Sequence, residues 1–83
     1  MISDRTKDVA QRATELYEGK LRSKLEDTNM HAFVAIEPDS GDHFIGATLS
    51  EAMQAARLEY PDRLSFGIRV GHRAAVHIGV LQP

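Results

Sequence analysis

The hydrophobic period of the chain changes near Asn29, and this change constrains the fold more than any other feature of the sequence. Before Asn29, apolar side chains recur at steps of three and four residues, as they do on one face of a helix. After it, they alternate at every second residue, as they do in strands. A chain that combines both periods packs helices on a sheet, so the sequence predicts an α+β fold.

A long, charged helix is predicted over about residues 4–27. Its apolar stripe is formed by Val9, Ala13, Leu16, Tyr17, Leu21 and Leu25. This stripe drifts around the helix because four residues exceed one helical turn. Gly19 costs about 1 kcal/mol relative to alanine inside a helix, so we expect the helix to bend or end near it. Acidic and basic side chains share the remaining surface, which indicates a solvated face.

A β-hairpin is predicted next, from residues 31–37 and 42–47 around the turn residues 38–41. A loop of this length pairs Val34 with Ile45. Side chains on both faces of the first strand are apolar, which suggests that something covers each side of the sheet.

A helix and a second strand pair follow the hairpin. Thr48 and Glu51 form a capping box that starts the helix, and Pro61 should end it near the preceding residue. Residues 64–70 alternate and predict a half-buried third strand, with Ser65, Gly67 and Arg69 on the outward side, and residues 75–81 predict a fourth strand. We therefore expect a ββαββ core over about residues 31–81, with a four-stranded, mainly antiparallel sheet in the order 2-1-3-4 and a two-layer architecture.

The 83 residues fit a single domain over 1–83, but so short a chain buries a small core. It has no cysteine for a disulfide, so oligomerisation is the remaining common means of stabilisation, and we expect a homo-oligomer. The absence of cysteine, of a secretory signal and of a long apolar run predicts a cytoplasmic protein that does not enter a membrane. A net charge of −2 gives no general attraction to nucleic acid.

The sequence contains no constellation that indicates catalysis. It lacks a Gly-x-Ser-x-Gly elbow and a glycine-rich phosphate loop, so we expect no enzyme, no catalytic residue and no cofactor. The histidines are scattered. The nearest candidate metal pairs, His43 with Asp42 and His72 with His77, do not have the spacing of a ligand set, so we predict no metal site.

The candidate partner-binding residues are four of the basic side chains after Asn29: Arg57, Arg69, Arg73 and His77. No aromatic side chains interleave with them on the same face, so a protein partner is favoured over nucleic acid. The alternative hypothesis is a small enzyme or nucleic-acid-binding protein that uses His43, His77 and Arg69 in a cleft between subunits.

Residues 33–57, FVAIEPDSGDHFIGATLSEAMQAAR, resemble the core segment of HicB-type antitoxins, while the chain otherwise resembles small bacterial α+β proteins. The matching positions are Pro38, Asp39, Gly46, Thr48, Glu51 and Ala52. The resemblance implies a degenerate RNase-H-like domain without catalytic residues that binds a toxin. In two respects the chain departs from that family: it opens with a long helix instead of a strand, and it shows no appended DNA-binding segment. Autoregulatory DNA binding is therefore not expected.

Overall fold

The computed structural model describes residues 4–72, which form an α+β fold with a long N-terminal helix and an antiparallel sheet. The helical elements are α1 (Asp4–Leu16), the π-helical turn η1 (Tyr17–Leu21), α2 (Arg22–Thr28) and α3 (Leu49–Glu59). The strands are β1 (Phe33–Glu37), β2 (Asp42–Gly46) and β3 (Phe66–Arg69). No helix in this part of the chain is long and apolar enough to cross a membrane.

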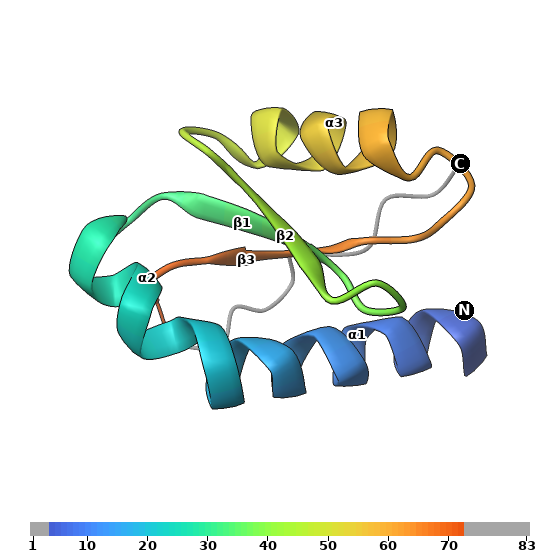
Figure 1. Cartoon of the computed structure of the whole chain (residues 1–83), viewed down its shortest axis with the longest axis horizontal. Helices are drawn as coiled ribbons and strands as arrows, with labels where there is room; N and C mark the ends of the chain where they lie inside the picture. Colours follow the sequence, from blue (N-terminus) through green and yellow to red (C-terminus); the bar gives the residue numbers. More distant parts are fainter. Residues whose placement is uncertain (1–3, 73–83) are drawn as a thin grey trace.

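The elements form three layers, so the prediction of a two-layer fold is wrong. In Figure 1, α1 lies on one side of the sheet and α3 on the other. Each side has its own apolar cluster: one joins Val34 and Ile36 of β1 to the N-terminal helices, and the other joins Ala35 to α3. The physical reason lies in β1, whose successive side chains point to opposite faces and are apolar on both.

The N-terminal helix contains a π-helical turn, η1, around Gly19. Buried Val9, Ala13, Tyr17 and Leu25 are separated by multiples of four residues, and each four-residue step overshoots a helical turn by about 40°. In η1 the backbone N–H of Arg22 bonds to the carbonyl of Tyr17, five residues back. The extra residue in this turn rotates the apolar stripe back toward the sheet by about 100°. The stripe therefore stays on the sheet, and the helix continues to Thr28 instead of ending at Gly19.

The three strands lie in the order β2-β1-β3, and both pairings are antiparallel. The predicted hairpin register is confirmed, with Val34 opposite Ile45 and Ala35 opposite Phe44. The fourth strand, predicted over 75–81, lies outside the described residues, and so does the part of the 2-1-3-4 order that depends on it. We call the two sides of the sheet the α1 face, which carries Val34, and the α3 face, which carries Ala35.

Helix α3 begins at the predicted capping box. The side chain of Thr48 accepts a hydrogen bond from the amide of Glu51 at 3.1 Å, and the Glu51 carboxylate accepts one from the amide of Ala47 at 2.9 Å. The helix ends at Glu59, close to the predicted end before Pro61. Ala52, Met53 and Ala56 are buried against the sheet. These short side chains let α3 lie close to the α3 face.

Strand β3 differs from its predicted form. Its alternation predicted a strand buried on one face only, with Ser65, Gly67 and Arg69 directed away from the core. In the structure Ser65 and Gly67 are buried, because α3 also packs on this side of β3. Alternation of apolar residues therefore identified the α1 face but missed that the small residues on the other face lie beneath a helix.

Candidate functional site

The outer edge of β2 is the first candidate site, because no other described strand pairs with it. β1 occupies the middle of the sheet and pairs on both sides, whereas β2 pairs with β1 alone. Alternate residues of such an edge strand direct their backbone N–H and C=O groups away from the sheet. These groups can receive another strand by main-chain hydrogen bonds, which is a common way to recognise an extended peptide.

The elements that the structure describes also cover little of the α1 face of β2. On this face α1 packs against β1 and β3, and the apolar cluster beneath the sheet takes its strand residues from those two strands. Ile45 lies on the same face, opposite Val34, yet 39% of its surface is exposed. His43 lies beside it, opposite Ile36, and is half-buried. An unpaired strand edge can receive a strand of another protein, and a side chain of that strand would then cover Ile45.

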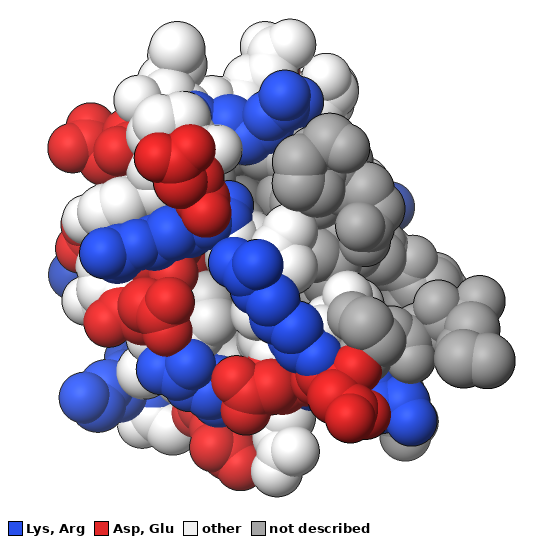
Figure 2. Space-filling model, turned by 90° about the vertical axis from the view of Figure 1, so that its right-hand side faces the viewer, with Lys and Arg blue, Asp and Glu red and all other residues white. Residues whose placement is uncertain are grey.

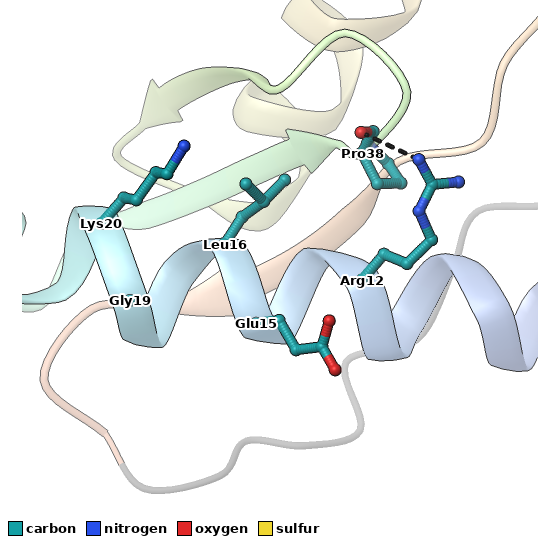
Figure 3. Close-up of a pocket in the computed structure, with 6 residues that line it drawn as sticks. All are labelled: Arg12, Glu15, Leu16, Gly19, Lys20 and Pro38. Atoms are coloured by element: carbon teal, nitrogen blue, oxygen red, sulfur yellow. Dashed lines mark hydrogen bonds between the residues drawn. The ribbon is translucent and has the colours of Figure 1, made fainter.

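A pocket of about 390 Å³ opens on the same side of the sheet, between the N-terminal helix and the start of the hairpin loop. Arg12, Leu16 and Lys20 follow one another along the helix, and Figure 3 shows all three directed toward the sheet. Gly19 and Pro38 complete the wall, while Glu15 points away. Lys20 forms no ion pair with another described residue, whereas Arg12 donates to the carbonyl of Pro38 at 3.3 Å. The pocket thus combines an apolar base with one available positive charge.

On the face shown in Figure 2, Lys and Arg side chains are interspersed with Asp and Glu side chains and do not form a patch of one sign. Several charged side chains of residues 4–72 form ion pairs, including Arg12 with Asp39 at 2.8 Å and Arg22 with Glu18 at 2.8 Å. A surface of paired charges gives weak long-range attraction to a polyanion.

The loop of the β1–β2 hairpin is held from both sides by a set of contacts that we call the hairpin clamp, made by Arg12, Tyr60 and Arg63 with Glu37, Pro38, Asp39 and Asp42. From the α1 side, Arg12 donates to the Asp39 carboxylate at 2.8 Å. From the α3 side, Arg63 donates to Glu37 at 3.1 Å, and the Tyr60 hydroxyl donates to the Asp42 carboxylate. The ring of Tyr60 also lies 5.2 Å below the Arg63 guanidinium.

Glu37 is the buried acid at the centre of the clamp, with no exposed surface. Its carboxylate accepts hydrogen bonds from the amides of Asp39 and Ser40 at 2.9 and 2.8 Å. Its carbonyl accepts from the amide of Gly41, which has φ +82°, at 2.9 Å. Burial alone would raise the pKa of Glu37, but the hydrogen bonds from Ser40, Asp39 and Arg63 outweigh it and lower the pKa. Glu37 is therefore ionised and fully bonded at neutral pH, which suits a structural role better than proton transfer.

His31 and His72 make a contact that sequence reasoning missed. The Nδ1 atom of His31 and the Nε2 atom of His72 are 3.0 Å apart, although 41 residues separate them in the chain. His31 has φ +72°, and its N–H bonds to the carbonyl of Val70 at 3.1 Å, so the pairing of β1 with β3 holds it in place. Partial desolvation lowers the pKa of His72, and the nearby charges of Arg69 and His31 lower it further. Within residues 4–72, no three metal-ligating side chains gather to hold an ion.

The structure separates the predicted site residues that it describes. Arg57 lies in the last turn of α3, whereas Arg69 lies at the end of β3, opposite Phe33 of β1. Arg69 donates to the carbonyl of His31 at 3.3 Å and lies 5.3 Å from the ring of Phe33. His43 is on the α1 face and Arg69 on the α3 face, so these two do not converge within one chain. Arg73 and His77 lie outside the described residues.

The β2 edge could have been recognised from the sequence only in part. The hairpin register identified Ile45 as a partner of Val34, but the offset of α1 toward β1 and β3 has no local signal in the sequence.

No family model, curated protein or solved structure matches the chain.

Proposed function

We propose that this chain is a non-enzymatic protein-binding domain of the cytoplasm, and that its binding surface is the outer edge of β2. The observation that carries the proposal is the exposure of Ile45 on a strand that, within residues 4–72, has one partner strand and little cover on its α1 face. A strand from a partner would bond to the β2 backbone, and an apolar side chain of that strand would cover Ile45. The pocket near Lys20 would favour an acidic group beside that strand.

A toxin is the class of partner that we propose first. Residues 33–57 resemble HicB-type antitoxins, and this segment contains the whole of β2 and most of α3. The positions that match also have structural roles here: Thr48 caps α3, and Pro38 and Asp39 belong to the hairpin clamp. An antitoxin-like role requires only a binding surface, and the edge of β2 with its exposed Ile45 would supply one.

Capture experiments with matched variants test the proposal. The wild-type chain, an Ile45→Lys variant and a Leu58→Lys variant would each be immobilised and exposed to a lysate of the source organism. Both substitutions replace an exposed apolar residue by lysine, but Leu58 lies on α3 and is 85% exposed. We expect Ile45→Lys to lose a partner that Leu58→Lys retains, because a lysine at a strand edge opposes pairing. A partner that both variants retain, or that both lose, would refute the β2 surface.

A further inference from the structure

The edge of β2 lacks the features by which proteins usually protect an unpaired strand. Such edges commonly carry lysine, proline or an inward charge. β2 reads Asp-His-Phe-Ile-Gly and contains neither lysine nor proline. Its one acidic residue, Asp42, stands at the first position and accepts a hydrogen bond from Tyr60. The four residues that follow present an edge without a fixed charge.

Because of the length of β2, one register of antiparallel pairing with β2 of a second copy is better than the adjacent registers. Five residues form the strand, and Phe44 is the middle one. A two-fold axis at Phe44 places every residue of β2 opposite a residue of the same strand in a second copy. Moving the axis by one residue in either direction would leave the ends of β2 without a strand partner. The axis at Phe44 also keeps each side chain on its own face of the sheet.

The side chains that face one another in this arrangement are compatible. Ile45 lies opposite His43 of the copy, and both are on the poorly covered α1 face. Phe44 lies opposite its equivalent on the α3 face. Asp42 lies opposite Gly46 of the copy, so the two acidic side chains are at opposite ends of the pair and do not repel each other. The pairing therefore covers Ile45 without placing like charges together.

We propose that β2 pairs antiparallel with β2 of a second copy, joining the two sheets across a two-fold axis at Phe44. This proposal rests on the proposed function: the second copy occupies the same edge, and a toxin strand would have to displace it. A short chain gains buried apolar surface by such an association. The copy's strand would lie beside β2 in the plane of the sheet, on the side opposite β1.

Engineered cysteines test the register, because the wild-type chain has none that could react. The His43→Cys and Ile45→Cys variants would be mixed and oxidised under mild conditions. We expect the mixed disulfide between position 43 of one copy and position 45 of the other to exceed either homotypic disulfide several-fold. A Gln54→Cys variant, with its exposed site on α3, is the control and should form no preferred cross-link. Homotypic products in equal yield, or equal cross-linking at position 54, would overturn the register.

Two measurements on the wild-type chain make the result independent of any variant. Light scattering at high micromolar concentration should give the mass of a dimer, and the Ile45→Lys variant should be a monomer at the same concentration. Hydrogen exchange at residues 43 and 45 should slow as the concentration rises, whereas exchange in α3 should not change. A wild-type monomer whose exchange is independent of concentration overturns the second copy. If Ile45→Lys still loses a captured partner in that case, the proposed function stands with a different occupant.

Discussion

Arg63 donates a hydrogen bond to the buried carboxylate of Glu37 across 3.1 Å, although 26 residues separate the two in the chain. Arg63 follows α3, and Glu37 ends β1, so the pair ties the helix on the α3 face to the loop of the hairpin. The carboxylate is buried, whereas the guanidinium side chain remains 45% exposed. The pair therefore fixes the end of β2 that begins the proposed binding edge.

Replacing Glu37 by glutamine should destabilise the fold. The amide has one acceptor oxygen, so at least one of the donors from Asp39, Ser40 and Arg63 would lose its partner in a buried site. We expect a loss of about 1 to 3 kcal/mol in the free energy of unfolding, measured by urea denaturation. Glu59→Gln is the matched control, because Glu59 is exposed, and it should change stability by less than about 0.5 kcal/mol. Equal effects of the two substitutions would contradict a special role for Glu37.

Glu37 should also contribute to acid unfolding. Its pKa in the folded chain is lowered from the ordinary value of 4.5, so the unfolded chain binds the proton more readily. The stabilisation is therefore fully present above that value and is lost as the pH falls through the lower, folded pKa. Circular dichroism between neutral and acidic pH should show the wild-type chain losing stability in this range. The Glu37→Gln variant should lose less across the same range, and parallel curves for the two proteins would argue against the assignment.

The contact between His31 and His72 predicts a second pH dependence. The pKa of His72 is lowered from 6.5 in the folded chain, so the unfolded state takes up its proton first. Stability should therefore decrease as the pH falls from about 6.5 toward the lower, folded pKa of His72. The thermal midpoint of a His72→Gln variant should depend less on pH in this window than that of the wild-type chain. A His72→Gln curve parallel to that of the wild type would remove the prediction.

Two glycines should respond to alanine in opposite directions. A Cβ atom at Gly46 would lie 2.6 Å from the backbone nitrogen of Ala52 and 2.8 Å from the Cβ of Glu51, so the start of α3 would have to move. We expect Gly46→Ala to cost about 1 to 3 kcal/mol. A Cβ at Gly19 would meet nothing within 4 Å, and Gly19→Ala should gain about 0.5 to 1 kcal/mol. Urea midpoints compare the two, and a stabilising Gly46→Ala would show that the close approach is not required.

The arrangement of the arginines predicts weak binding to nucleic acid. Arg12, Arg22 and Arg63 are paired with acidic side chains, and Arg57 and Arg69 belong to different elements, α3 and β3. Fluorescence anisotropy with labelled single-stranded and duplex DNA should therefore show no saturable binding. A complex that forms at about 50 mM salt and weakens steeply by about 200 mM would reveal a basic surface and favour the nucleic-acid alternative.

Local sequence signals determined most of the elements. The change of period near Asn29, the turn after Glu37 and the capping box at Thr48 each act over a few residues, and the structure confirms the hairpin register and the start of α3. Each signal depends on contacts between near neighbours in the chain, so the residue types are enough to identify it.

Tertiary packing decided the rest. The third layer, the π-helical turn that keeps Leu25 on the sheet, and the burial of Glu37 against Arg63 depend on segments far apart in the chain. The contact of His31 with His72 and the exposure of Ile45 have the same origin. A sequence pattern states which face of a strand is apolar, but the element that covers this face, and the edge that it leaves open, are set by how whole helices and strands pack in space.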